Sequence, residues 1–291
     1  TIMASAEDVP GLGIVDFTTI APAFSAGVRA LIANRVNLFA TFHEGVRAPN
    51  LQETTALGDT GNFFEVPNGD LGPERADSLE VGARAHLPWL RVEAAYFHTW
   101  LSDAIVRQEV EGGSALYPEA GDATVMARVN AEEAVIDGVE VGLVTASLWG
   151  LSLYGDLAWV QSDVTRVDGS QEPGRRIPPL QGRLGVTWRG ASHGAVASLG
   201  VRWAAPQARL SPGDRKDLRI CEDPDHPGAT LAQCGGTPGW IALDLRAGLT
   251  PRPGLRLEAG VSNLTDTRYR HHGSGQDGAG ISVRLSARQS F

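Results

Sequence analysis

The stretch LRLEAGVSN, residues 255–263, alternates apolar side chains with polar side chains or glycine. After a short loop, the same alternation returns in ISVRLSAR, residues 281–288. Successive side chains of a β-strand point to opposite faces, so each stretch predicts a strand with one apolar and one polar face. The other strands that the sequence predicts repeat this pattern, which is typical of a closed wall with lipid outside and water inside.

About eleven such strands are predicted, and several exceed the roughly 5 to 6 residues that are usual in soluble sheets. Their connections alternate between turns of a few residues and much longer loops, of which 206–239 is the longest. This asymmetry is typical of transmembrane antiparallel up-and-down β-barrels, which have short periplasmic turns and long external loops. Residues 1–23 are turn-rich and are predicted to be an N-terminal loop segment, and residues 24–291 are predicted to be barrel wall.

The composition of the 291-residue chain restricts its possible partners. No run approaches the roughly 18 to 20 consecutive apolar residues of a spanning helix, so strands would have to carry a membrane role. The net charge of -9 argues against nucleic-acid binding, which needs clustered lysine and arginine. A soluble β-solenoid or large sandwich is the alternative fold, but a packed core could not bury the charges of both signs that the polar rows carry.

Two cysteines, Cys221 and Cys234, lie close together in the longest predicted loop. A local disulfide formed in an oxidising compartment is the simplest interpretation. Two free thiols or a partial metal site are the alternative. His226 lies between the cysteines, but one histidine does not complete a zinc set, so no metal site is predicted.

Six motifs follow one another along the chain in a recognisable order. They are FHEGVRAPNLQ (42–52), LGPERADSLEVG (71–82), IDGVEV (136–141), RIPPLQGRLG (176–185), the strand 239–249, and VSNLTD (261–266). Together they resemble the barrel of TonB-dependent outer-membrane receptors. The residues that carry the resemblance most directly are Arg47, Ala48, Pro49, Asn50, Asn263, Leu264 and Asp266.

The resemblance implies a barrel of about 22 strands that encloses an N-terminal plug, in the outer membrane of a Gram-negative bacterium. This chain resembles the C-terminal half of such a barrel, without the plug. Its last residue, Phe291, resembles the signal that the barrel-assembly machinery recognises. Eleven strands would leave two unpaired edges in lipid, so we expect a separate chain or segment to complete the wall.

The implied function is active uptake of a scarce ligand of the iron-siderophore, haem or cobalamin class. The implied partners are the TonB-ExbB-ExbD complex, reached through the absent plug, and outer-membrane lipid and lipopolysaccharide. A passive porin-like channel and an outer-membrane adhesin barrel are the alternatives. No catalytic set is visible, so neither an enzyme nor a cofactor is predicted.

Four residues are candidates for ligand contact. Arg175 and Arg176 could bind an anionic ligand or a lipopolysaccharide phosphate, although a charge pair between loop and strand is an equal alternative. His271 and His272 could bind metal or haem, but adjacent residues on a strand point to opposite faces. The motif at Arg47 is expected to shape the start of an external loop, and direct substrate contact is the alternative. An acidic group in 206–239 could bind calcium, but a solvated loop is favoured; it comprises Asp214, Asp217, Glu222, Asp223 and Asp225.

Overall fold

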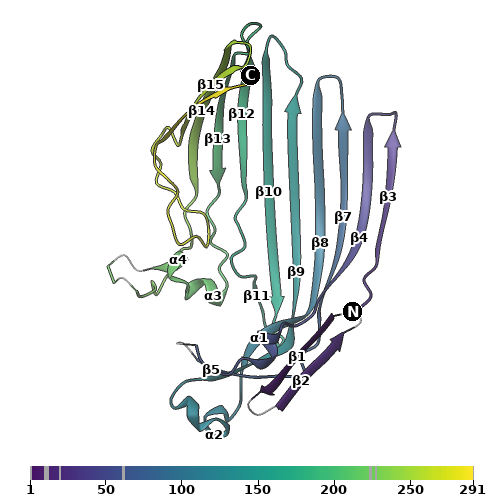
Figure 1. Cartoon of the computed structure of the whole chain (residues 1–291), viewed down its shortest axis with the longest axis vertical. Helices are drawn as coiled ribbons and strands as arrows, with labels where there is room; N and C mark the ends of the chain where they lie inside the picture. Colours follow the sequence, from purple (N-terminus) through teal and green to yellow (C-terminus); the bar gives the residue numbers. More distant parts are fainter. Residues whose placement is uncertain are drawn as a thin grey trace.

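The computed structural model describes residues 2–9, 13–19, 21–60, 63–222, 225–226 and 228–290. Figure 1 shows a tall, curved antiparallel sheet in which each wall strand pairs with the next one along the chain. Eleven strands form this wall, as the sequence predicts. They are β3 (Ser25–Ile32), β4 (Val36–Arg47), β7 (Glu74–His86), β8 (Leu90–Glu109), β9 (Val125–Thr145), β10 (Leu151–Thr165), β12 (Gln181–Arg189), β13 (Val196–Ala204), β14 (Trp240–Arg252), β15 (Leu255–Ser262) and β16 (Ser282–Gln289).

The wall does not close on itself within the described residues, so β3 and β16 are its two edges. Three short strands lie beside it: β6 (Phe64–Val66) runs parallel to β9 and also pairs with β5 (Gly58–Asp59), and β11 (Gln171–Pro173) pairs with β10. The helices are short and lie in the long loops: α1 (Leu51–Thr55), α2 (Gly113–Leu116), η1 (Pro118–Ala120), α3 (Pro212–Arg215) and α4 (Leu218–Cys221). No helix in the described part of the chain is long and apolar enough to cross a membrane.

A separate hairpin precedes the wall. It pairs β1 (Ile2–Val9) with β2 (Gly13–Thr19), where the sequence predicts a loop over 1–23. That prediction is wrong for both strands. The turn-forming Pro10 and Gly11 favoured a loop, but the β-branched and aromatic residues of GIVDFTT favour a strand once a partner strand satisfies their backbone groups.

The two faces of the wall differ as the alternation predicts. On the outer face one row of apolar side chains crosses six strands in register. None of its members is buried, and Val283, for example, is 67% exposed. Exposed apolar surface of this extent is typical of a membrane or protein interface. The row consists of Leu153, Val186, Leu199, Leu245, Val261 and Val283.

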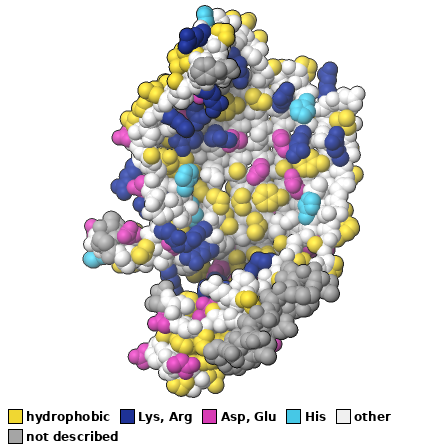
Figure 2. All heavy atoms as spheres, in the orientation of Figure 1, with side chains coloured by type: hydrophobic (Ala, Val, Ile, Leu, Met, Phe, Trp, Pro, Cys, Tyr) yellow, Lys and Arg dark blue, Asp and Glu magenta, His cyan; other side chains and the backbone are white. Residues whose placement is uncertain are grey.

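The opposite, inner face is polar, and Figure 2 shows charges of both signs across it. Cross-strand ion pairs join neighbouring strands on this face. Arg84 pairs with Glu93 at 2.7 Å, Arg183 with Asp156 at 2.7 Å, and Arg202 with Asp244 at 2.6 Å. Because these charged groups are paired across the strands and remain partly exposed, this face is suited to line an aqueous bore.

The connections are distributed unequally between the two rims. Short turns join β3 to β4, β7 to β8, β9 to β10, β12 to β13 and β14 to β15, and all lie at the same end (Figure 1). The long connections 48–73, 110–124, 166–180, 205–239 and 263–281 lie at the other end. Trp89 and Trp149 are highly exposed at the short-turn rim, where interface aromatics are expected.

Candidate functional site

The connection 263–281 folds inward over the polar face at the long-loop rim. Asn263 anchors it, because its side chain donates to the carbonyls of Thr267 and Ala279, at 2.9 and 3.0 Å, and accepts from the Thr267 amide. The backbone amide of Asn263 donates to the carboxylate of Asp244 on β14 at 3.0 Å. Asn263 is only 1% exposed, so both ends of the connection are fixed to one buried side chain.

Asp266 also joins the two ends of the connection 263–281, because its carboxylate accepts the Ile281 backbone amide at 3.1 Å. Asn263 and Asp266 both have positive φ angles, of 53° and 49°. Asparagine and aspartate tolerate this left-handed region better than most residues. The Leu264 amide donates to the Leu243 carbonyl at 2.7 Å, which continues the β14 backbone pairing into the turn.

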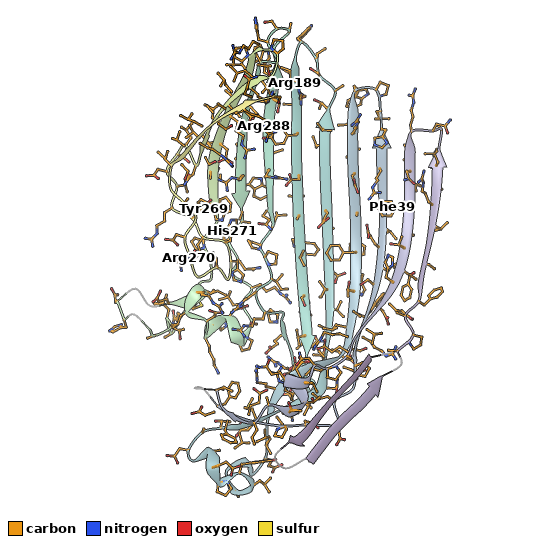
Figure 3. All side chains as sticks on the ribbon, in the orientation of Figure 1. Phe39, Arg189, Tyr269, Arg270, His271 and Arg288 are labelled. Carbon is orange, nitrogen blue, oxygen red and sulfur yellow. A yellow bond between two sulfur atoms is a disulfide. The ribbon has the colours of Figure 1, made fainter. Side chains whose placement is uncertain are left out.

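An aromatic cluster lies where this connection covers β13 and β14. Tyr269 packs against Trp240, with ring centroids 4.4 Å apart, and His271 meets both rings edge-on, at 5.2 Å from Trp240 and 5.8 Å from Tyr269. Figure 3 shows Tyr269, Arg270 and His271 together at this rim. The Arg202 guanidinium lies 5.5 Å from the centre of the Tyr269 ring and donates to its hydroxyl.

A pocket of about 330 Å³ lies beside these rings, between 205–239 and 263–281. Trp240 and Tyr269 provide its aromatic wall, and three arginines provide positive charge. Asp277 pairs with both Arg268, at 2.8 Å, and Arg270, at 2.6 Å, and these pairs lower its pKa. The third arginine, Arg219, belongs to a second charge cluster.

That cluster has Asp217 at its centre. The Asp217 carboxylate pairs with Arg176 at 2.7 Å, Arg219 at 2.8 Å and Arg175 at 3.3 Å, although its own side chain is only 4% exposed. Three guanidinium groups therefore share one carboxylate, and the cluster keeps an excess of positive charge. Arg175 is the most exposed of the three arginines, so it presents that charge to solvent.

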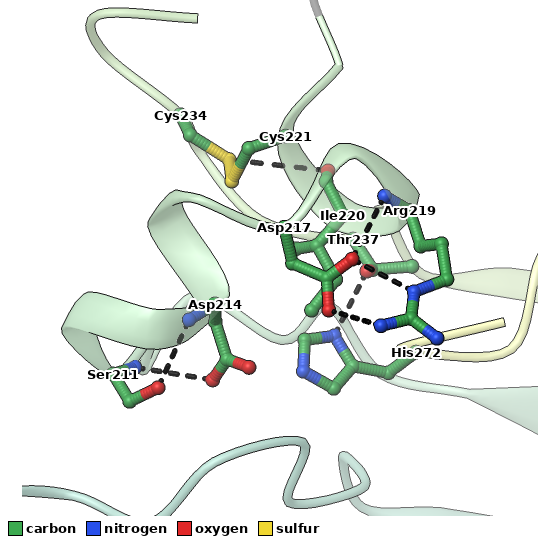
Figure 4. Close-up of a disulfide and its surroundings, with 9 residues drawn as sticks. All are labelled: Ser211, Asp214, Asp217, Arg219, Ile220, Cys221, Cys234, Thr237 and His272. Atoms are coloured by element: carbon green, nitrogen blue, oxygen red, sulfur yellow. Dashed lines mark hydrogen bonds and ion pairs between the residues drawn. A yellow bond between two sulfur atoms is a disulfide. The ribbon is translucent and has the colours of Figure 1, made fainter. Parts of the chain in front are cut away.

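The neighbouring carboxylate of Asp214 is completely buried and has a structural role. It accepts the backbone amides of Ser211 and Arg176. The Ser211 hydroxyl accepts the Asp214 amide in return, and Figure 4 shows this reciprocal pair of Ser211 and Asp214. This reciprocal arrangement caps the first turn of α3. Among the acidic residues considered for calcium, Asp214 and Asp217 thus hold the loop together, and Asp223 lies outside the described residues.

Cys221 and Cys234 form the predicted disulfide. It joins the end of α4 to the later segment of the same loop that leads back to β14. In that segment the Leu231 amide also donates to the Cys221 carbonyl at 2.8 Å. The disulfide therefore restrains the helix that carries Arg219 and is capped by Asp217. A covalent link of this kind reduces the freedom of the loop before any ligand is present.

The two adjacent histidines have different surroundings. His271 is exposed and belongs to the aromatic cluster, whereas the His272 Nδ1 lies 2.9 Å from the Thr237 hydroxyl. The Nε2 of His272 is buried and has no hydrogen-bond partner in the part of the chain that the structure describes. Burial lowers the pKa of His272, and the charges of Asp214 and Asp217 only partly oppose this effect.

The structure thus brings Arg175, Arg176, His271 and His272 to one rim, around the 205–239 and 263–281 connections. The residues that sequence reasoning missed are Trp240 and Tyr269. Trp240 lies within the motif 239–249 and Tyr269 follows the motif 261–266, but only the inward fold of 263–281 places their rings in contact.

Comparison with known proteins identifies the wall. The family described as TonB dependent receptor-like, beta-barrel, matches residues 8–264. The chain belongs to this family. TonB-dependent receptors are outer-membrane proteins of Gram-negative bacteria.

Relatives of this TonB-dependent receptor barrel are transporters and receptors. The heme/hemopexin utilization protein C of Haemophilus influenzae is 25% identical over 292 residues, covering 89% of this chain and 36% of that protein. The FrpB iron transporter from Neisseria meningitidis superposes with a TM-score of 0.69 at 16% identity, covering 96% of this chain and 40% of that chain. The copper transporter OprC gives 0.68 at 20% identity, with 92% and 39% covered. The chain therefore spans less than half the length of each.

The motif from Arg47 to Asn50 of the TonB-dependent receptor barrel lies at the start of the long connection 48–73. Arg47 pairs with Glu74, and with Glu53 at 2.8 Å. Asn50 caps α1 by accepting the Glu53 amide, and Glu53 accepts the Asn50 amide in return. These contacts join the end of β4 to α1 and to the first residue of β7, so they give the motif a structural role at the start of the connection. Phe291, the proposed assembly signal, lies outside the described residues.

The half-buried His272 predicts that the stability of the rim depends on pH in the TonB-dependent receptor barrel. Its folded pKa lies below the ordinary value of 6.5, so an unfolded connection binds the proton more readily. The folded connection is therefore fully stable above about pH 6.5 and loses stability as the pH falls below that value. We expect the hydrogen-exchange protection of 263–281, corrected for intrinsic rates, to decrease between pH 7.5 and 5.5.

The variant His272→Gln should remove this pH dependence. His193→Gln is the matched control, because His193 lies in a short turn at the opposite rim. Protection that declines equally in both variants would contradict the assignment to His272.

Proposed function

We propose that this chain is the C-terminal wall of a TonB-dependent transporter that takes up a scarce iron ligand of the haem or siderophore class. The observation that carries the proposal is the rim site, where an aromatic wall, an exposed imidazole and an excess of arginine lie together at the long-loop mouth. The names of the Haemophilus and Neisseria proteins, for haem and iron, support the same class of ligand.

The residues of the rim match this class chemically. Tyr269 would offer a ring face to a flat conjugated ligand, and the buried Trp240 packs against Tyr269 and supports its ring. Arg175 and Arg219 offer planar donors for carboxylates such as those that haem bears. His271 offers an imidazole, a common iron ligand, at the exposed edge of the cluster.

The remaining parts of such a transporter would lie outside this chain. A second chain or segment would pair with the edges β3 and β16, because an unpaired edge in hydrocarbon is costly. A plug would couple the barrel to the TonB-ExbB-ExbD complex. Outer-membrane lipid and lipopolysaccharide would contact the exposed apolar row, and the assembly machinery would insert the wall.

Ligand binding and uptake by the complete receptor test the proposal. We expect the double variant W240A/Y269A to bind haem at least tenfold more weakly in an absorbance titration, because each lost ring contact contributes about 1 kcal/mol. Trp149→Ala is the matched control, since Trp149 is an exposed aromatic residue at the opposite rim. Haem and an iron-catecholate complex should be compared in the same titration to establish which class binds.

Energy dependence separates the proposal from its alternatives. Uptake of the bound ligand by cells should cease when a protonophore removes the proton gradient. Uptake that continues unchanged would indicate a porin-like channel, and binding without any uptake would indicate an adhesin. Either result would overturn the proposed transport function.

A further inference from the structure

A small pocket lies on the outer face of the wall, where β12 ends earlier than its neighbour β10. The strand β10 continues to Thr165, but its pairing with β12 stops at Ala158 and Gln181 (Figure 1). The irregular segments 177–180 and 205–209 lie beside this unpaired part of β10 and enclose a pocket of about 200 Å³. We call it the outer pocket. Its apolar lining includes Trp159, Pro178, Pro179, Leu180, Ala205 and Pro206.

The strand register places the outer pocket on the lipid-facing side of the wall. Leu153 belongs to the exposed apolar row, and Leu157 and Trp159 point to the same face because they follow it at intervals of two along β10. Leu157 lies in one row with Trp203 and Ile241, and this row borders the pocket on the side of the short turns. The pocket therefore continues the apolar surface toward the long-loop rim.

The lengths of the strands place the pocket at the depth of lipid chains. The strands β12 and β13 have 9 residues each. At about 3.3 Å per residue and a tilt of about 45°, they rise roughly 21 Å, which is less than the apolar band of about 25 Å. The irregular segments that continue these two strands must therefore face the last few ångströms of hydrocarbon.

The backbone of these segments is suited to that environment. Irregular backbone can face hydrocarbon only where its polar groups are already satisfied. Three of the lining residues are prolines, which have no N–H group to leave unpaired. The Ala205 amide donates to the Leu180 carbonyl at 2.8 Å, and the Gln207 side chain donates to the Ile177 carbonyl at 2.8 Å.

The polar groups at the long-loop side of the pocket are bonded to one another. Arg209 pairs with Asp163 and donates to the Ser162 carbonyl at 2.6 Å. The Gln161 side chain donates to the Asp163 carboxylate at 3.3 Å. The charges of Arg209 and Asp163 thus balance each other, and a phosphate or a sugar would have to break these contacts to bind. A hydrocarbon chain would meet only the apolar lining and would leave the contacts intact.

We propose that the outer pocket holds one acyl chain of lipid A, the membrane anchor of the lipopolysaccharide in the external leaflet. The pocket is smaller than the roughly 300 to 1,000 Å³ that hold a whole small molecule, so it suits one part of a larger amphiphile. The external leaflet is selected because the pocket lies at the end of the apolar band nearest the long loops, which are external in this class of barrel. The inference rests on the membrane location of the wall and not on the ligand that is transported.

Lipid retention by the complete receptor tests the proposal. The purified receptor is freed of lipid in detergent, incubated with lipid A, and measured by native mass spectrometry. Ala205→Trp fills the pocket with an indole ring, so we expect the fraction of receptor that carries lipid A to fall at least fivefold. Ala197→Trp is the matched control, because Ala197 points outward on β13 near the opposite rim. This control should retain lipid A within twofold of the unmodified receptor.

A second variant tests the pocket without adding bulk. Leu180→Ala removes part of the apolar lining, so we expect it to lower lipid A retention two- to threefold. Leu199→Ala is its control, since Leu199 is an exposed member of the outer row away from the pocket. The mobility of the unheated barrel in SDS gel electrophoresis checks that each variant is folded.

Retention of lipid A by both pocket variants at the level of their controls would overturn the proposal. Retention of phosphatidylglycerol equal to that of lipid A would show that any acyl chain enters the pocket, and would overturn the assignment to lipid A. Because the readout is a bound lipid and not uptake, failure of this proposal can be distinguished from failure of the transport function.

Discussion

Replacing Asp217 by alanine is expected to release the disulfide-tied loop from the rim. Its carboxylate is the shared partner of Arg175, Arg176 and Arg219, and it also accepts the Arg219 amide at the start of α4. The three guanidinium groups are 38 to 56% exposed, so water compensates part of their charge once the carboxylate is removed. The lost ion pairs and the lost cap of α4 are together expected to cost about 1 to 3 kcal/mol. We expect hydrogen-exchange protection of 206–239 to decrease by about one to two orders of magnitude.

The conservative change Asp217→Asn removes the negative charge of the side chain but keeps its size, so it separates the effect of the charge from the effect of the side-chain volume. The amide keeps one acceptor oxygen but cannot balance three guanidinium groups, so we expect an intermediate loss of protection. Asp168→Ala is the control, since Asp168 is a fully exposed carboxylate in a turn, where it accepts the amide of nearby Ser170. If Asp217→Ala exchanged like this control, the cluster would not hold the loop.

Replacing Asn263 by alanine is expected to detach the connection 263–281 from the inner face. The change leaves the carbonyls of Thr267 and Ala279 and the amide of Thr267 without their partner. Each unsatisfied buried group costs about 1 to 3 kcal/mol, so a total loss of about 3 to 5 kcal/mol is expected. Tyr269 would then leave Trp240, and haem binding at the rim should fall with it.

Two further variants show which property of Asn263 matters. Asn263→Gly keeps the left-handed backbone but removes the amide, so it should lose nearly as much protection in 263–281 as alanine does. Leu264→Ala should have little effect, because the contact of Leu264 with β14 is made by its backbone. A glycine variant that kept full protection would show that backbone conformation, and not the amide, holds the connection.

The wall could be predicted from the sequence because its signal is local. Alternation with a period of two is visible along each strand, as in LRLEAGVSN, and it fixes which residues face outward before any partner strand is known. The disulfide could be predicted for a similar reason, since Cys221 and Cys234 are close in sequence. The unequal lengths of turns and loops likewise required only the positions of the strands.

The rim could not be predicted in the same way, because its contacts join distant residues. Arg176 and Asp217 are 41 positions apart, and Arg202 and Tyr269 are 67 apart, and no local pattern indicates either contact. The motif at Asn263 could be recognised as a motif. That it closes a connection over Trp240 depends on how two loops meet in space.

The heights of the strands have a consequence for how the molecule meets its surroundings. The hairpin of β8 and β9 has strands of 20 and 21 residues, whereas β12 and β13 have 9 residues each. At about 3.3 Å per residue and a tilt of about 45°, the longer strands rise roughly 45 Å, well above the apolar band of about 25 Å. The rim that carries the long connections is therefore uneven in height. The tall side belongs to β8 and β9, and the low side, at β12 and β13, lies next to the aromatic cluster of Trp240, Tyr269 and His271.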